Sequence, residues 1–148
     1  MRAIVIRVGL ALLGALHLSW GIPATFAPRW FYDHFPGLGR SWTAAYPPFN
    51  AHLVTDLGAT FTTLGVLLGL AAWLADRKVT AVVLCGVLVF SSLHLAFHLR
   101  HHGALAGMDL VASLAALTMG VVLPALLLVL DRRRRAYGRA HGHATDSI

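Results

Sequence analysis

The sequence predicts an all-α integral membrane protein, an antiparallel bundle of four transmembrane helices with a short interfacial helix in its first outer loop. Apolar residues make up 57% of the 148 positions and charged residues 12%, with a mean hydropathy of +0.70. A water-soluble domain carries about 25% charged residues, so lipid is the expected solvent. The chain also holds four apolar runs long enough to cross a bilayer core, at about 3–22, 51–75, 79–99 and 106–130.

These four runs form one transmembrane domain, residues 1–130, because they leave room only for an outer loop at 23–50 and a polar tail at 131–148. The connections at 76–78 and 100–107 are short, so the last three helices should be antiparallel neighbours. The first run has no small-x-small cleavage site free of a nearby proline, and we expect it to be retained as a helix. The basic tail is expected to be disordered and cytoplasmic.

The distribution of basic residues predicts the orientation, since short cytoplasmic segments of membrane proteins are enriched in Lys and Arg. With the N-terminus inside, nine of the twelve basic residues lie on the cytoplasmic side, which predicts a multi-pass protein of the cell membrane with both termini in the cytoplasm. The run at 132–135 directly follows a spanning helix, so its expected partner is anionic lipid and not nucleic acid. The cytoplasmic set is Arg2, Arg7, Arg77, Lys78, Arg132, Arg133, Arg134, Arg135 and Arg139, against Arg29, Arg40 and Arg100 outside.

The outer loop at 23–50 is rich in aromatic residues, which settle in the headgroup region of a bilayer. We expect a short interfacial helix at about 28–35, ended by Pro36 and Gly37. The loop has two interpretations at this point, an aromatic belt at the membrane surface or a lid over a site beneath it.

Six His and Asp residues lie inside the predicted spans, where ionisable groups are unfavourable and usually face the bundle interior at a functional site. The up-down topology places all six near the outer ends of their helices, at about the same depth. They are His17, His52, Asp56, His94, His98 and Asp109.

Helical spacing groups these residues further. His52 and Asp56 are four residues apart and share a helix face, as do His94 and His98, with Ser91 one turn away. Asp109 begins a similar stripe that continues with Ser113, Ala116 and Gly120. Four such faces turned inward would make a single polar pocket.

Paired His residues at this spacing, with a His or Asp on the next helix, are how helical bundles build metal sites. Imidazole with carboxylate suits zinc, iron or copper. We expect His52, Asp56, His94 and His98 as core ligands, completed or supported by His17 and Asp109. Haem ligation and a metal-free polar network or proton pathway are the alternatives.

The glycine-spaced segment from Asp56 to Gly65, together with Asn50, His52 and the proline-containing first loop, resembles the DoxX-like small membrane proteins. Those proteins are linked to quinone-coupled and thiol-linked redox systems, so the resemblance implies an oxidoreductase context. The His94 and His98 pair and the single cysteine, Cys85, depart from that pattern.

The sequence-based hypothesis is therefore a metal-dependent membrane oxidoreductase using iron or copper, or else zinc, with its site in the outer half of the bundle. No residue is assigned a catalytic role beyond metal binding. The alternatives are a non-enzymatic accessory subunit of a membrane redox complex and a haem-binding four-helix protein. Candidate partners are the lipid bilayer, a small hydrophobic substrate or quinone, and a second copy or a larger membrane complex.

Overall fold

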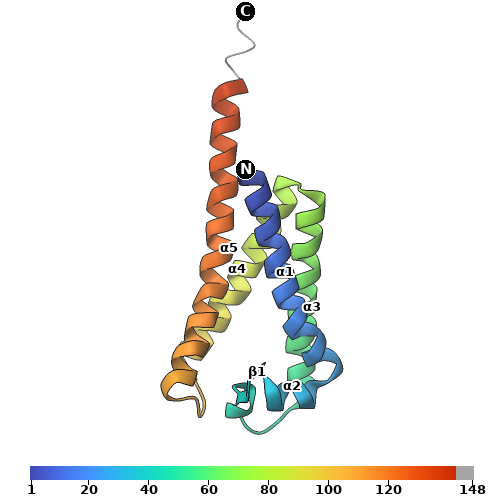
Figure 1. Cartoon of the computed structure of the whole chain (residues 1–148), viewed down its shortest axis with the longest axis vertical. Coiled ribbons are helices and arrows are strands. Elements are labelled where there is room, and N and C mark those ends of the chain that lie inside the picture. The colour runs from blue at the N-terminus through green and yellow to red at the C-terminus, as the bar shows by residue number, and fades with distance from the viewer. Residues whose placement is uncertain (143–148) are drawn as a thin grey trace, which may run out of the picture.

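Four long helices form the protein, and a folded loop joins the first two of them (Figure 1). The structure is a computed structural model that describes residues 1–142, with side chains described as far as Arg132. Each long helix includes a segment long and apolar enough to cross a membrane. The predicted bundle of four candidate membrane spans is confirmed. The helices are α1 (Arg2–Phe26), α3 (Ala51–Leu74), α4 (Arg77–Arg100) and α5 (Gly107–Gly142).

The helix boundaries follow from local capping. Asn50 caps α3, its side-chain oxygen accepting a hydrogen bond from the Leu53 amide at 3.1 Å. Asp76 caps α4 in the same way through the Val79 amide at 2.9 Å. Between these helices, Ala75 takes a left-handed conformation with φ 52°, which reverses the chain within two residues.

The last helix runs farther than the sequence predicts. Instead of ending near residue 130, α5 continues to Gly142 and projects beyond the rest of the bundle (Figure 1). Ala and Arg are both favourable helix formers, so the basic segment propagates a helix that the apolar segment has already nucleated. The remainder of the predicted tail, residues 143–148, lies outside the described residues.

Glycines bring α1 and α3 into close contact. A Cβ atom on Gly14 would lie 3.0 Å from the Gly65 carbonyl oxygen and 3.2 Å from the Gly69 amide nitrogen. Nearer the loop, a Cβ on Gly21 or Gly58 would meet backbone atoms of the facing helix at 2.5 Å. Small residues spaced along a helix permit this approach. The sequence pairs Gly65 with Gly69 as a small-xxx-small motif; Gly65 lies in the contact, whereas a Cβ on Gly69 would meet nothing within 4 Å.

The four helices behave as two pairs, α1 with α3 and α4 with α5, that meet at one end and diverge at the other (Figure 1). We call the end with the N-terminus and the α3–α4 turn the terminal end, and the opposite end the loop end. Apolar side chains from all four helices fill the terminal end, where Leu10, Leu68, Leu84 and Leu127 belong to one buried cluster. The separation of the pairs at the loop end is what leaves room for a site.

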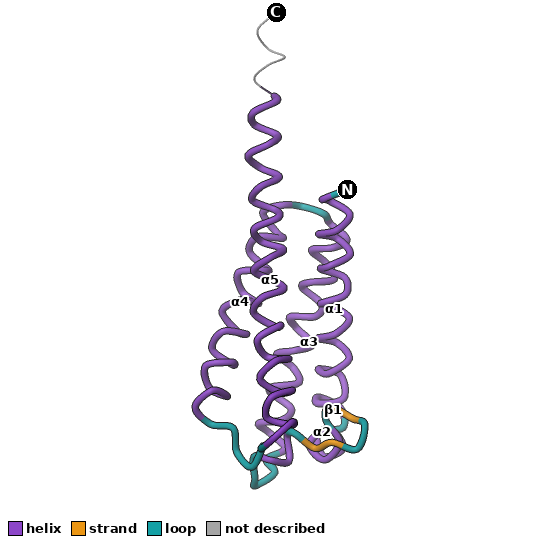
Figure 2. Tube along the Cα trace, turned by 60° about the vertical axis from the view of Figure 1, so that its left-hand side comes forward, coloured by secondary structure: helices purple, strands orange, loops and turns teal. Residues whose placement is uncertain are grey.

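The loop between α1 and α3 is compactly folded. It contains α2 (Pro28–His34), strands β1 (Pro36–Gly37) and β2 (Arg40–Ser41), and a 3₁₀ turn, η1 (Thr43–Ala45). The short helix expected at 28–35 is confirmed. The small hairpin was not predicted, although its two-residue turn of Leu38 and Gly39 follows Gly37, and this Gly-x-Gly segment, all at positive φ, carries a turn signal. Figure 2 shows this loop and the α4–α5 turn at the same end of the bundle.

The glycine contact between α1 and α3 can be tested by adding one methyl group. Gly58→Ala would place its Cβ 2.5 Å from the Thr25 amide nitrogen, so we expect it to destabilise the protein by about 1–3 kcal/mol. Gly69→Ala on the same helix is the matched control, because its Cβ meets nothing within 4 Å. Thermal unfolding in detergent measures both variants, and equal midpoints for the two would contradict the packing described.

Candidate functional site: a pocket between the helix pairs

A pocket of about 450 Å³ occupies the space between the diverging helix pairs at the loop end. Leu13 and Leu16 of α1, Leu57 of α3, and Leu117 and Leu123 of α5 supply apolar walls. The polar atoms of the lining form a small part of its surface, and the residues that carry them come from different elements. They are His17, Trp20, Tyr32, Trp42, Thr43, Tyr46, Asn50, Ser91, His94, His98 and Ser113.

The folded loop closes the loop end of this pocket by bonding to the α4–α5 pair. The amide of Ala104, in the α4–α5 turn, donates to the Ala45 carbonyl at 3.0 Å. The Trp42 indole nitrogen donates to Asp109 of α5 at 3.0 Å, and Arg40 forms an ion pair with the same carboxylate oxygen. A loop that begins on α1 thus holds the two diverging pairs together, which supports the lid interpretation over a simple belt.

His17 lies buried on the α1 side of the pocket. Its Nδ1 lies 2.8 Å from the Leu13 carbonyl oxygen. A carbonyl can only accept, so Nδ1 is the protonated nitrogen and Nε2 of the neutral ring keeps its lone pair. His17 therefore offers the pocket a hydrogen-bond acceptor or one metal ligand.

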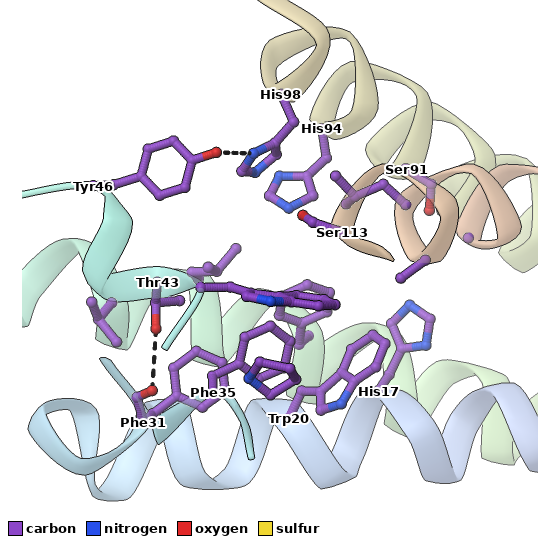
Figure 3. Close-up of a pocket in the computed structure, with 18 of the residues that line it drawn as sticks. His17, Trp20, Phe31, Phe35, Thr43, Tyr46, Ser91, His94, His98 and Ser113 are labelled. Carbon is purple, nitrogen blue, oxygen red and sulfur yellow. Dashed lines mark hydrogen bonds between the residues drawn. The ribbon is translucent and has the colours of Figure 1, made fainter. Parts of the chain in front are cut away.

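His94 and His98 line the opposite side, on adjacent turns of α4, as Figure 3 shows. Their ring centroids are 4.7 Å apart in an edge-to-face arrangement. The His94 ring also stacks on Phe90 at 5.4 Å. The predicted face of α4 that carries Ser91, His94 and His98 is confirmed as a pocket wall, and Ser113 of α5 lies beside it (Figure 3).

Tyr46 fixes the orientation of His98 from the loop. Its hydroxyl lies 2.8 Å from His98 Nδ1 (Figure 3). Burial raises the pKa of the Tyr46 hydroxyl, so this group stays protonated at neutral pH. When the hydroxyl donates to Nδ1, the proton of the neutral imidazole resides on Nε2, and His98 becomes a donor.

Aromatic rings make up much of the remaining wall. Trp20 packs edge-on against Phe35 at 5.7 Å and against Phe61 at 5.9 Å. The Phe61 ring contacts both sides of the pocket, with its centroid 5.7 Å from that of His17 and 6.2 Å from that of His94. Flat surfaces of this kind favour a planar ligand.

His52 and Asp56 do not reach the pocket, which corrects the expectation of a single polar pocket containing all six residues. Their side chains are 87% and 61% exposed, and they pair with each other at 3.4 Å between Nε2 and Oδ2. The close contact with α1 sets the rotation of α3. Because Gly58 and Gly65 face α1, residues about half a turn away around the helix face outward.

Asp109 also lies apart from the pocket histidines. Its carboxylate is engaged by Arg40 and Trp42, so it anchors the loop instead of joining a ligand set. The structure thus brings together His17, His94 and His98 around one pocket and places His52, Asp56 and Asp109 elsewhere. Within the described part of the chain, no group of three or more His, Cys, Asp or Glu side chains is positioned to hold one metal ion.

Several pocket residues escaped the sequence-based assignment. Trp20 and Phe61 were indistinguishable from ordinary core residues, since nothing in the spacing of aromatic residues marks a cavity. Tyr46 carried a weak signal, because it follows a cluster of aromatic residues in a loop for which a lid over the site was one of two interpretations. Its partnership with His98 spans 52 positions and required the fold.

The anchoring role of Asp109 predicts a local effect of its removal. Asp109→Asn should abolish the ion pair with Arg40 and weaken the bond from Trp42, so hydrogen exchange across residues 36–46 should accelerate. Asp33→Asn is the control, because that carboxylate pairs with Arg29 inside the loop and forms no hydrogen bond or ion pair with the α5 side chains that the structure describes. Unchanged exchange in Asp109→Asn would contradict the proposed anchor.

Comparisons of the chain with protein-family models, curated proteins and solved structures find no match. The resemblance to DoxX-like proteins therefore remains a hypothesis from the sequence, and functional inference depends on the pocket itself.

Proposed function

We propose that this protein binds a small lipophilic molecule with a planar, hydrogen-bonding ring, of the quinone class, in the pocket between its two helix pairs. The observation that carries the proposal is an apolar, aromatic-lined cavity with imidazoles on opposite walls. Such a ligand would partition into the bilayer and reach the pocket from there. An orientation with both termini in the cytoplasm, taken from the basic residues, would put the pocket in the outer half of the cell membrane.

The size and composition of the cavity support a ligand of this class. Ligand pockets typically measure about 300–1,000 Å³ and combine apolar walls with a few convergent polar groups. The volume of about 450 Å³ accommodates a substituted ring with part of an alkyl chain. Leu117 and Leu123, toward the terminal end, would contact the chain, while the rings of Trp20 and Phe61 would contact the planar head group.

The hydrogen-bonding capacity of the walls is complementary to such a head group. His98, oriented by Tyr46, can donate through Nε2 to a ring carbonyl. His17 can accept through Nε2 from a ring hydroxyl. A ring with oxygen atoms on opposite edges would use both, in its oxidised or its reduced form. This is a binding site suited to a membrane redox system, whether the protein is itself an enzyme or an accessory subunit.

Ligand binding should be measurable by quenching of tryptophan fluorescence, because Trp20 and Trp42 both line the pocket. We expect a short-chain benzoquinone or naphthoquinone to bind in detergent, and His98→Leu to weaken its affinity by about three- to tenfold, the value of one hydrogen bond. His52→Leu is the matched control, since it changes a histidine outside the pocket. Binding that is equal in wild type and His98→Leu, or absent from wild type, would overturn the proposal.

A metal-dependent oxidoreductase is the second candidate, and the pairing of His94 with His98 favours it. Two imidazoles one turn apart with centroids 4.7 Å from each other can share one metal ion after small rotations. His17 and exogenous ligands would have to complete the coordination. Iron, copper and zinc all remain compatible with this donor set.

Elemental analysis of tag-free protein, grown with zinc, iron and copper supplied together, distinguishes this candidate. One metal ion per chain is expected, falling by at least about tenfold in His94→Ala and in His98→Ala because the ligands act as a unit. His52→Ala should retain the metal. A Soret absorption band would instead identify haem, and well under one metal ion per chain would remove the metal-dependent candidate.

A further inference from the structure

The outward-facing residues of α3 form a continuous exposed stripe that the pocket does not explain. His52 and Asp56 begin it at the loop end, Ala59 and Thr63 follow, and Val66 and Leu70 continue it toward the terminal end. The spacing of four, three, four, three and four residues keeps all six on one side of the helix. This stripe is centred about a third of a turn from Gly58 and Gly65, away from the face that contacts α1.

The paired His52 and Asp56 side chains on this face are in an unfavourable place. Asp56 lies five residues into α3, about 7.5 Å along its axis from the first residue, and its side chain is 61% exposed. In a candidate membrane span, an exposed face meets lipid or another protein, and ionisable groups in spans usually face protein or water. Within one chain, His52 Nε2 lies 3.4 Å from Asp56 Oδ2, and this contact leaves the other nitrogen of the imidazole and the other oxygen of the carboxylate exposed.

We propose that this stripe is the interface of a parallel homodimer, in which His52 of each chain pairs with Asp56 of the other. A two-fold axis along the bilayer normal places the same stripe on both sides of the contact. The pair carries one donor and one carboxylate, so it is complementary to a copy of itself. The axis brings each carboxylate to a second imidazole at nearly the same depth.

The middle of the stripe allows the required approach. Ala59 and Thr63 form a small-xxx-small pair, which permits two helices to pack closely in a membrane. Val66 and Leu70, 47% and 43% exposed, supply apolar contact below it. The interface is separate from the ligand pocket, because none of these six residues lines that cavity.

Cysteine cross-linking in liposomes locates the interface. In full-length protein carrying Cys85→Ala, Ala59→Cys should form disulfide-linked dimers far faster than Leu93→Cys under mild oxidation. Leu93, 69% exposed, is the matched control, lying at a comparable distance from the loop end of α4 but outside the stripe. Equal rates for the two variants would overturn the proposal, as would capture of a different protein in place of a second copy in native membranes.

Charge variants test the pairing itself through energy transfer between labelled chains in liposomes. Asp56→Asn should weaken dimerisation by between about threefold and twentyfold, the range implied by interhelical hydrogen bonds in membranes. His52→Asp, which places four carboxylates at the interface, should weaken it further. The exchanged variant His52→Asp/Asp56→His keeps both reciprocal pairs and should restore association. Dimer affinity that is unchanged in Asp56→Asn and in His52→Asp would show that the pair does not hold the chains together.

Discussion

The close contact between α1 and α3 is the constraint on which the rest of the structure depends. Gly14 and Gly21 of α1 pack against Gly58 and Gly65 of α3 so tightly that added Cβ atoms would meet backbone at 2.5–3.0 Å. Contact at this distance fixes the rotation of both helices. It turns His17 toward the interior and His52 with Asp56 toward the outside. This single helix–helix contact therefore places the ionisable residues of α1 and α3 in different environments.

The divergence of the α4–α5 pair follows from a contrast along the bundle. Leucines from all four helices interlock at the terminal end. At the loop end, the histidines and serines of α4 and α5 face the aromatic residues of the other pair and leave a cavity. The loop compensates for the lost helix contact through Asp109, His98 and the backbone of Ala45. The same bonds from the loop therefore both close the pocket and join the two helix pairs at the loop end.

Much of this arrangement was predictable from the sequence. The four spans and the short helix α2 follow from hydropathy and local chemistry, which act over a few residues. The shared face of Ser91, His94 and His98 follows from helical periodicity. Periodicity states which residues share a face but not where that face points, and so the inward orientation expected for His52 and Asp56 was wrong. A signal was present, because Gly58 and Gly65 lie about half a turn from that pair.

Dividing the histidines between two surfaces changes the chemistry that each can perform. A compact set of four His and Asp ligands would favour a metal ion, whereas His17 and His98 on opposite walls, each with Nδ1 engaged, present one acceptor and one donor across an apolar cavity. That arrangement would suit the proposed ligand, a molecule with two polar edges and a planar body. His52 and Asp56 lie instead on the exposed face of α3, where their contact with each other leaves hydrogen-bonding positions unused. Reciprocal pairing in the proposed dimer would fill those positions. Because α3 contributes Leu57 and Phe61 to the pocket and the stripe to the proposed dimer, a rotation of this one helix would alter both surfaces together.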